Sequence, residues 1–538
     1  LLTVLTAAVL AFSLTACEKP SEGLDYELNE NQNAYYVTGL GTCADTNIVI
    51  PSEYQGLPVI GIGNRAFYGC TSLTSITIPD GVASIGSWIF AKCSSLKSIT
   101  LPDSVTSIGY EAFSGCTKLE SIYYTGDIAS WCKISGLNNL LTSLRTLYIN
   151  GNKIEGNLNI PNNVTSIGSY SFSFCGKLTG ITIPDSVTSI GKDAFRDCTG
   201  LVNITIGDSV SNIDSSAFLN TAWYDNQPNG LVYAGKVAYK YKGTMPENTS
   251  ISLKRDTISI NNSAFVNCNG LERIMIPDSV TTIGDEAFRG CTSLSIIMIP
   301  DSVTTIGNFA FSGCRGLTSI TGSATNVSAV ARQARPTSFV VNITSGNIID
   351  NSAFSECSGL TSITIPDCVT SIGYSAFSNC NRLTTITIPD CVTSIGYSAF
   401  SGCKGLTNIT IPDSLTSIGE GAFNDTSWYN NQPNGLVYAG KVAYSYKGTM
   451  PNNTSVVLKE GTLGIASSAF SDCNELTSVT IPDSVTNIGG GAFSDCTKLT
   501  SITIGNGVTI IGHAAFRSCT SLTSISIPDS VTSIEYYA

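Results

Sequence analysis

A repeat of 23 residues is the feature that most restricts the folds open to this chain. Fourteen of its 19 cysteines fall 23 residues apart within blocks: Cys70, Cys93 and Cys116; Cys175 and Cys198; Cys268, Cys291 and Cys314; Cys357, Cys380 and Cys403; Cys473, Cys496 and Cys519. A phenylalanine such as Phe67 stands three residues before each of them, and a large aliphatic residue such as Leu73 stands three residues after. Self-similarity at a fixed period of about 20 to 50 residues is typical of stacked repeats. The sequence therefore predicts a solenoid rather than several globular domains.

One repeat, "CTSLTSITIPDGVASIGSWIF" at residues 70–90, shows how each coil is built. From Leu73 onward, apolar and hydroxyl residues alternate, which predicts a short strand with one inward face. Pro79 ends that strand, because proline has no amide hydrogen for a ladder. Val82 and Ile85 begin a second inward side, and a glycine corner and a phenylalanine complete the coil. One coil therefore contributes about seven inward residues, counted from this pattern.

A single coil is too small to fold alone. Burying a large apolar side chain yields roughly 1.5–3 kcal/mol, whereas ordering each of the residues of a coil costs roughly 1–2 kcal/mol. Stacking removes the exposed faces of neighbouring coils and lets their parallel strands pair about 4.8 Å apart. Repetition is therefore how this sequence builds a core.

The pattern LxxLxL resembles a leucine-rich repeat, and the fuller phrase "CxxLxxIxIPDSVxxIGxxAF" closely resembles the BspA-like bacterial leucine-rich repeat family. The likeness runs from about Gly61 to Glu535, and "YYVTGLGTCADTNIVIPSEYQGLPVIGIGNRAF" is similar to the start module of such proteins. The resemblance implies an α/β-type, β-rich solenoid of 23-residue repeats, elongated and right-handed, with parallel strands. It also implies a surface lipoprotein that adheres to host matrix proteins or to other bacteria.

Three parts are expected along the chain. Residues 1–17 are predicted to be a lipoprotein signal peptide, and residues 18–60 an N-terminal cap module. Residues 61–538 are predicted to form the solenoid. Its 23-residue register is interrupted by irregular modules near 120–160, 219–260, 321–345 and 424–465, of which the third has the composition of a short helix or loop.

The first sixteen residues, "LLTVLTAAVLAFSLTA", are uncharged and mostly apolar, as in the core of a secretory signal. "LTAC" at residues 14–17 resembles the lipobox of bacterial lipoproteins, in which the cysteine becomes the acylated first residue, so Cys17 is the predicted lipid anchor. The alternative is an ordinary signal peptide that contains a cysteine. The predicted location is exported and lipid-anchored, at the outer membrane or cell surface.

Charge and composition restrict the classes of partner that this chain can bind. The net charge is -12 and the isoelectric point is about 4.7, which argues against nucleic acid, because phosphate binding needs clustered lysine and arginine. No later segment is apolar for about 18 residues, so contact with a membrane is expected only through the lipid. The partners expected from the resemblance are extracellular or host matrix proteins, other bacterial surfaces, or glycans.

Two of the irregular modules contain the identical string "NQPNGLVYAGKVAY", at residues 226–239 and 431–444. An Asn-Gly pair followed by two short aromatic and β-branched runs around Ala-Gly predicts hairpin-like strands. The candidate binding residues of these modules are aromatic: Trp223, Tyr224, Tyr233 and Tyr239 in the first, and Trp428, Tyr429, Tyr438 and Tyr444 in the second. Such rings either stack on sugars, anchor a protein partner or patch the core where the coil is irregular.

The remaining candidates are weaker. The repeated aspartates of "PD", such as Asp80, are expected to cap turns rather than hold metal, and the repeat cysteines are expected to be small buried residues. Cys368 and Cys391 replace the same serine in adjacent coils and form a candidate disulfide. The single histidine, His513, is expected to face solvent.

The outward serine and threonine pairs of the strands, such as Thr385 and Thr387, form a regular hydroxyl surface. Three interpretations of that surface remain open. It serves strand propensity and solubility, or it is a broad adhesive face in which many small contacts add, or, more remotely, it is an ice-binding array.

These observations predict a surface protein that binds proteins or glycans through its solenoid and is not an enzyme. No catalytic site, metal site or cofactor is predicted. The alternative function is an accessory glycan-binding lipoprotein of a nutrient-capture system that uses the Trp/Tyr modules.

Overall fold

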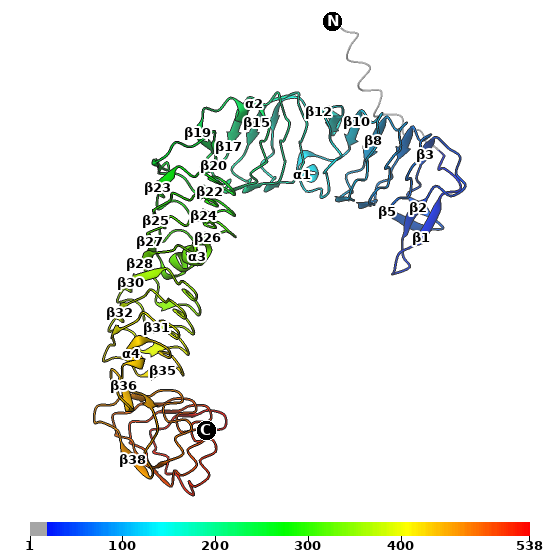
Figure 1. The fold of residues 1–538 in the computed structure, drawn as a ribbon. Helices are drawn as coiled ribbons and strands as arrows, with labels where there is room; N and C mark the ends of the chain where they lie inside the picture. The colour runs from blue at the N-terminus through cyan, green and yellow to red at the C-terminus, as the bar shows by residue number, and fades with distance from the viewer. Residues whose placement is uncertain (1–18) are drawn as a thin grey trace. The chain divides into compact units, whose positions relative to one another are not determined.

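The computed structural model describes residues 19–538, and the predicted leader with Cys17 lies outside the described residues. The chain divides into two compact units between Lys242 and Gly243. Each unit is a stack of coils joined by parallel strands (Figure 1). The β-rich repeat solenoid expected from the sequence is therefore confirmed.

The strands of the first unit form ladders along its coils. They are β1 (Asp25–Leu28), β2 (Tyr35–Gly39), β5 (Leu57–Ile62), β7 (Ser84–Ile85) and β9 (Ser107–Ile108), with β4 (Glu53–Tyr54) on β5; β3 (Asn47–Val49), β6 (Ser75–Thr77), β8 (Ser98–Leu101), β10 (Ser121–Tyr124), β11 (Thr146–Ile149) and β12 (Asn152–Lys153); β13 (Gly156–Asn159), β15 (Leu178–Ile183) and β17 (Asn203–Ile206); β14 (Ser166–Ile167), β16 (Ser189–Ile190) and β18 (Asn212–Ile213); and the hairpin β19 (Gly230–Ala234) and β20 (Val237–Lys242). Its helices are α1 (Ile128–Trp131) and α2 (Ala222–Asp225).

The second unit is built in the same way. Its strands are β21 (Thr249–Ser252), β23 (Leu271–Met275), β25 (Ile296–Met298), β27 (Ser319–Gly322), β28 (Phe339–Ile343) and β30 (Leu360–Thr364); β22 (Ser259–Ile260), β24 (Thr282–Ile283) and β26 (Thr305–Ile306); β29 (Ile348–Ile349), β31 (Ser371–Ile372), β33 (Ser394–Ile395) and β35 (Ser417–Ile418); β32 (Thr385–Thr387) and β34 (Asn408–Thr410); β36 (Gly435–Ala439), β37 (Val442–Lys447), β39 (Gly464–Ile465), β41 (Asn487–Ile488), β43 (Ile510–Ile511) and β44 (Ser533–Ile534); and β38 (Thr454–Val457), β40 (Leu476–Thr480) and β42 (Ser501–Thr503). Its helices are α3 (Ala324–Ala334) and α4 (Ser427–Asn430).

Each regular coil contributes two strands to two different ladders. The first is the strand that reads "SIT", "TIT" or a close variant, as β32 does, and the second is the two-residue "SI" strand that follows the proline turn, as β33 is. Neighbouring coils pair in parallel and in register 23 residues apart, so that Ile395 lies beside both Ile372 and Ile418. Equivalent residues of successive coils therefore form straight columns.

The core is a column of phenylalanine rings next to a column of cysteines. In the second unit Phe377, Phe400 and Phe423 are buried, with ring centroids 5.1 and 5.6 Å apart. The Cys403 thiol donates to the carbonyl oxygen of Phe377 in the preceding coil at 2.9 Å. The same bond recurs in the later cysteines of each block, for example from Cys93 to Phe67 at 3.1 Å. Eleven of the fourteen repeat cysteines are buried, as predicted, while Cys70, Cys175 and Cys519 are half-buried. Burial raises the pKa of the Cys93 thiol to about 12.

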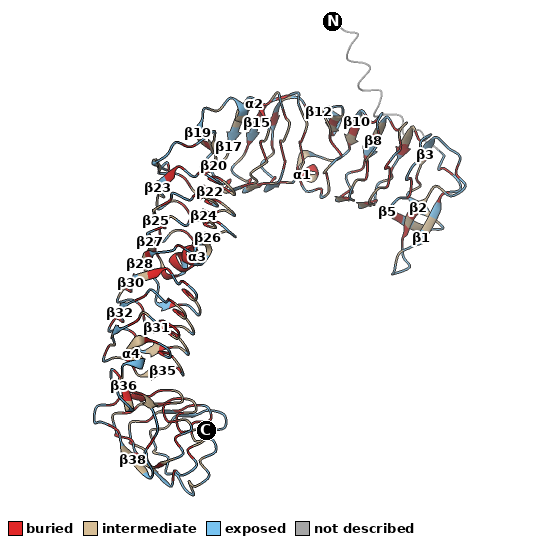
Figure 2. Ribbon diagram, in the orientation of Figure 1, coloured by how far each residue is buried: buried red, intermediate tan, exposed pale blue. Residues whose placement is uncertain are grey.

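The expected interruptions coincide with helices and hairpins. The segment predicted as a short helix or loop contains α3, which is buried along most of its length (Figure 2). The identical strings form antiparallel hairpins, β19 with β20 and β36 with β37. Their turns lie at residues 235–236 and 440–441, beginning at the glycine of the Ala-Gly step, and the Asn-Gly pairs stand at the start of the first strands rather than at the turns. Each interruption removes one regular coil from the stack, and its own side chains must close the core there.

Candidate functional site

The two aromatic modules are built alike, from a one-turn helix followed by a hairpin. Thr221 and Thr426 cap the helices α2 and α4, because each hydroxyl accepts a hydrogen bond from a backbone amide, that of Tyr224 at 3.2 Å and that of Tyr429 at 3.1 Å. The same threonine hydroxyls donate to the carbonyl oxygen of the last phenylalanine of the regular column, Phe218 or Phe423. Each module is therefore attached directly to the end of a phenylalanine column.

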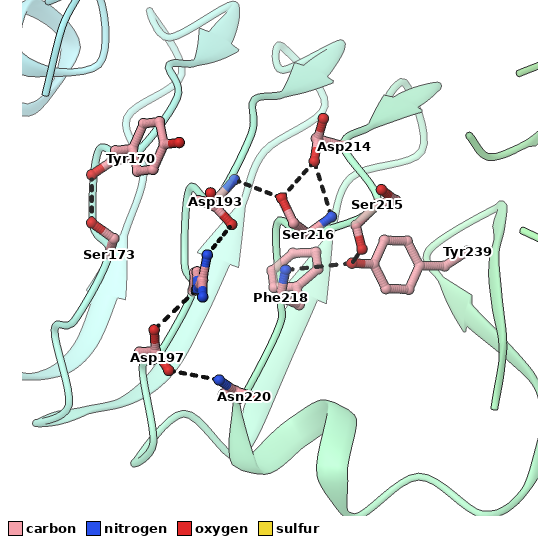
Figure 3. A network of polar contacts seen from close by, with 11 residues as sticks. Tyr170, Ser173, Asp193, Asp197, Asp214, Ser215, Ser216, Phe218, Asn220 and Tyr239 are labelled. Atoms are coloured by element: carbon pink, nitrogen blue, oxygen red, sulfur yellow. Dashed lines mark hydrogen bonds and ion pairs between the residues drawn. The ribbon is translucent and has the colours of Figure 1, made fainter. Parts of the chain in front are cut away.

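Trp223 and Tyr239 close the column that ends at Phe218. Both rings lie edge-on to Phe218, with centroids 5.2 and 5.8 Å away. The amide of Phe218 donates to the hydroxyl oxygen of Tyr239 at 3.4 Å, and that hydroxyl donates to the carbonyl oxygen of Ser215 at 3.0 Å (Figure 3). Burial raises the pKa of Tyr239 well above its ordinary value. Tyr239 is thus a core residue.

The second module repeats this geometry around Phe423. Trp428 and Tyr444 lie 5.0 and 5.3 Å from the Phe423 ring, and the Phe423 amide donates to the Tyr444 hydroxyl at 2.9 Å. Tyr444 is 3% exposed, and Trp428 is half-buried. The two modules therefore share one packing arrangement, in which a tryptophan and a tyrosine cover the last phenylalanine of a column.

Tyr224 and Tyr429 lie beside a lysine that caps their helices. Lys242 donates to the carbonyl oxygens of Tyr224, Asp225 and Gln227 at 2.6–3.1 Å, and its ammonium lies 5.6 Å from the Tyr224 ring. Lys447 does the same in the second module, 5.5 Å from the Tyr429 ring. A cation at the carbonyl end of a helix is favourable, and a ring face beside it adds a cation–π contact.

Tyr233 and Tyr438 occupy the outer part of the hairpins. Both are half-buried. The Tyr438 hydroxyl accepts from the amide of Lys459 at 3.1 Å, and the Lys459 ammonium lies 4.5 Å from its ring. The structure thus brings tryptophan and two tyrosines of each module together around a phenylalanine, while Tyr438 contacts a different part of the chain.

The outward side chains of the first strands form the most regular surface of the described residues. Thr385, Thr387, Asn408 and Thr410 are exposed, and the strand register places Thr387 beside Thr410. We define the strand face as Ser362, Thr364, Thr385, Thr387, Asn408 and Thr410 on β30, β32 and β34. Uncharged hydroxyl and amide groups thus stand in columns one coil apart.

A groove that the sequence did not reveal lies along the second strands of the second unit. It has a volume of about 530 Å³ and is lined by parts of two ladders, β31, β33 and β35 on one side and β41 and β43 on the other. Two exposed tyrosines, Tyr374 and Tyr397, line it, and so do His513 and Glu535. The tandem string "GYSAF" marked these tyrosines, but no sequence signal indicated that a second ladder would face them.

The remaining candidates show no cluster suited to catalysis. Cys368 and Cys391 are exposed free thiols, and the Cys368 thiol donates to the carbonyl oxygen of Gly346 at 3.2 Å, so their disulfide stays a prediction. His513 is exposed, as expected. Among residues 19–538 no group of three or more histidine, cysteine or acidic side chains could hold a metal ion.

Two of the repeated aspartates, Asp185 and Asp483, bond between coils. The carboxylate of Asp185 accepts from the amide of Asp208, 23 residues later, at 2.7 Å, and that of Asp483 accepts from Asn506 at 2.7 Å. These contacts join turns of adjacent coils rather than capping a turn of the same coil.

No helix within residues 19–538 is long and apolar enough to cross a membrane. The family model described as "BspA type Leucine rich repeat region (6 copies)" matches residues 41–133, 147–241, 235–334, 335–432 and 442–538. No curated protein matches the chain.

Several solved structures are similar to the chain. A leucine-rich repeat protein from Bacteroides ovatus is 26% identical, with 90% of this chain and 100% of that chain covered and a TM-score of 0.32. One from Eubacterium ventriosum is 21% identical, with 76% and 94% covered and a TM-score of 0.32. A leucine rich cell surface protein from Faecalibacterium prausnitzii is 23% identical, with 91% and 96% covered and a TM-score of 0.20.

Proposed function

Since the chain belongs to the BspA-type leucine-rich repeat family, we propose that it is a cell-surface protein that binds other proteins through the strand face of its solenoid. The expected partners are matrix proteins of a host or proteins on other bacterial surfaces. Repeat scaffolds of this kind present an extended surface that is suited to binding. The protein is therefore a binding protein rather than an enzyme.

The columns of exposed hydroxyl and amide groups on the strand face carry this proposal. Thr387 and Thr410 are held by neighbouring strands in fixed register, so they lose little freedom on binding. The Thr364 hydroxyl is oriented by a bond to the side chain of Asn342 at 3.1 Å. Many small contacts of this kind add when a long partner spans several coils.

Binding of the full chain, purified in mild detergent, to an array of matrix proteins tests the proposal. Thr387→Glu/Thr410→Glu places two carboxylates on the strand face and is expected to weaken binding at least about tenfold, because desolvating them opposes contact. Thr370→Glu/Thr393→Glu adds the same charge at exposed positions outside the strand face and serves as the matched control. Equal binding by both variants would show that the strand face is not the contact.

The lipid anchor at Cys17 is part of the same proposal, because a surface binding protein has to be retained by the cell. Metabolic labelling with a palmitate analogue is expected to mark the wild-type chain and not Cys17→Ser. Equal labelling of both would place any lipid elsewhere.

Glycan capture by the Trp/Tyr modules is less well supported by the contacts. Tyr239 and Tyr444 are buried. Trp223 and Trp428 pack edge-on against the last phenylalanine of the column, Phe218 or Phe423. These rings have a structural task that accounts for their positions.

A further inference from the structure

The groove on the second unit lies where the second module interrupts the ladder. One row of second strands ends at β35, and the next row begins again at β39. The two rows adjoin there, because the amide of Ser467 donates to the carbonyl oxygen of Ile418 at 3.0 Å. The groove is lined from both rows, from Ile348 to Gly419 on one side and from Ser467 to Glu535 on the other.

Tyr397 reaches across the groove from the first row to the second. A side-chain carbon placed on Gly490 would lie 3.6 Å from the Tyr397 hydroxyl oxygen. The same carbon would lie 3.3 Å from the carbonyl oxygen of His513, so a side chain at this position would narrow the groove and press against the neighbouring coil. The floor is likewise made of small residues, with Gly373, Gly396 and Gly489 among those that line it. At each of these glycines a side-chain carbon would meet the backbone of the neighbouring coil, so glycine there permits close stacking of the coils.

The lining groups have the chemistry of a site for a neutral sugar. Tyr374 and Tyr397 are 54% and 48% exposed, and each offers a broad apolar face with a polar tip. Hydroxyl, amide, imidazole and carboxylate groups come from Ser394, Asn487, His513 and Glu535. The lining contains no lysine or arginine, so phosphate and sulfate ligands lack a countercharge.

A peptide fits this site less well. Extended peptides commonly bind by pairing with an open sheet edge. Here the strands on the floor, such as β33, already pair with neighbours on both sides. The volume of about 530 Å³ falls within the range of small-ligand sites, roughly 300–1,000 Å³.

We propose that this groove binds a neutral oligosaccharide, with Tyr374 and Tyr397 against the apolar faces of its rings and the polar lining groups on its hydroxyls. The site is separate from the strand face and does not rest on the function assigned to it. It gives the protein a second ligand class, held where the second module interrupts the ladder.

An array of neutral oligosaccharides built from hexoses, pentoses and N-acetylhexosamines tests the proposal on the full chain in mild detergent. We expect at least one to bind with a dissociation constant below about 1 mM. Tyr374→Ala and Tyr397→Ala should each weaken it roughly 3- to 10-fold, in keeping with the contact energies of aromatic rings. Gly490→Tyr should abolish binding by filling the groove, and tyrosine is already tolerated at the equivalent position of other coils, as at Tyr397.

The matched control is Tyr110→Ala. Tyr110 occupies the equivalent position of a coil in the first unit and is 55% exposed. It should leave sugar binding unchanged, as should Thr387→Glu/Thr410→Glu on the strand face. The proposal is overturned if no neutral oligosaccharide binds, if binding survives in Gly490→Tyr, or if these variants lose a protein ligand instead of a sugar. Loss of protein binding in the strand-face variant alone bears on the proposed function and not on the groove.

Discussion

Removing the hydroxyl of Tyr444 isolates one bond that holds a module to the core. In a regular coil the phenylalanine amide donates to a backbone carbonyl of the next coil, as Phe400 does to Ala422 at 2.7 Å. At Phe423 the next coil is replaced by the module, and the Tyr444 hydroxyl accepts this bond at 2.9 Å. Tyr444→Phe keeps the ring and removes the acceptor.

The free-energy cost expected for Tyr444→Phe follows from the burial of the donor and the acceptor. Phe423 and Tyr444 are 0% and 3% exposed, so water cannot replace the lost acceptor. An unsatisfied buried donor costs about 1–3 kcal/mol, which corresponds to roughly 5- to 150-fold faster exchange of the Phe423 amide hydrogen when exchange occurs through local opening. The effect should be confined to coils next to the module, because contacts in a solenoid are between neighbours.

Hydrogen exchange resolved to single amides, at constant pH, measures this directly. Global unfolding is less suitable, because long repeat arrays depart from two-state behaviour. Tyr429→Phe is the control: its hydroxyl contacts that of Ser445 at 3.1 Å at a partly buried site, and a change within about 0.5 kcal/mol is expected. Unchanged protection of the Phe423 amide in Tyr444→Phe would refute the argument that the hydroxyl replaces the missing carbonyl.

Three further predictions concern the core and its cysteines. Burial raises the pKa of Cys93 and Cys314 from 9.0 to about 12, so the unfolded chain loses thiol protons at lower pH than the folded chain. The free energy of unfolding should therefore fall as the pH rises above about 9. In chemical denaturation, Cys314→Ala should make this fall with pH less steep. Phe400→Ala should lower local stability by about 3–5 kcal/mol, seen as faster proteolysis, because the ring is fully buried between two others; unchanged proteolysis would contradict this. Diamide oxidation, which takes two electrons and two protons from the thiols, should join Cys368 to Cys391, giving a cross-linked tryptic peptide that Cys391→Ser lacks.

Most of the regular coil could be predicted from the sequence. In the coil that begins at Leu73, the inward residues of the pattern are buried: Leu73, Ile76, Ile78, Val82, Ile85, Phe90 and Cys93. Periodicity sufficed because every coil has the same neighbours above and below, so the local pattern contains all the contacts. The hairpins were also predictable, because two short aromatic and β-branched runs flank a glycine turn, Gly235 in the first module, within a few residues.

The structural role of the aromatic side chains in the two modules was not predictable from the sequence, because it depends on contacts across a break in the 23-residue register. The sequence left sugar stacking, protein anchoring and core repair open for Trp223 and Tyr239. Core repair is what the contacts of Tyr239 show, since its hydroxyl lies between the Phe218 amide and the Ser215 carbonyl. The groove was missed for the same reason: Tyr397 and Gly490 are 93 residues apart, and their approach depends on how the module joins two ladders.

Three of the four breaks that follow a phenylalanine column, those after Phe218, Phe311 and Phe423, are closed in the same way. After Phe311, where α3 replaces the coil, the Phe311 amide donates to the side-chain oxygen of Gln333 at 3.0 Å, and the Gln333 amide donates to the carbonyl oxygen of Gly307 at 3.1 Å. A tyrosine in two modules and a glutamine in the third thus supply the acceptor that a regular coil supplies from its backbone. A buried amide without a partner is costly, so each of these three insertions supplies a side chain that accepts the bond. The modules are therefore complete structural units, which explains how the same string could occur twice without disturbing the coils on either side.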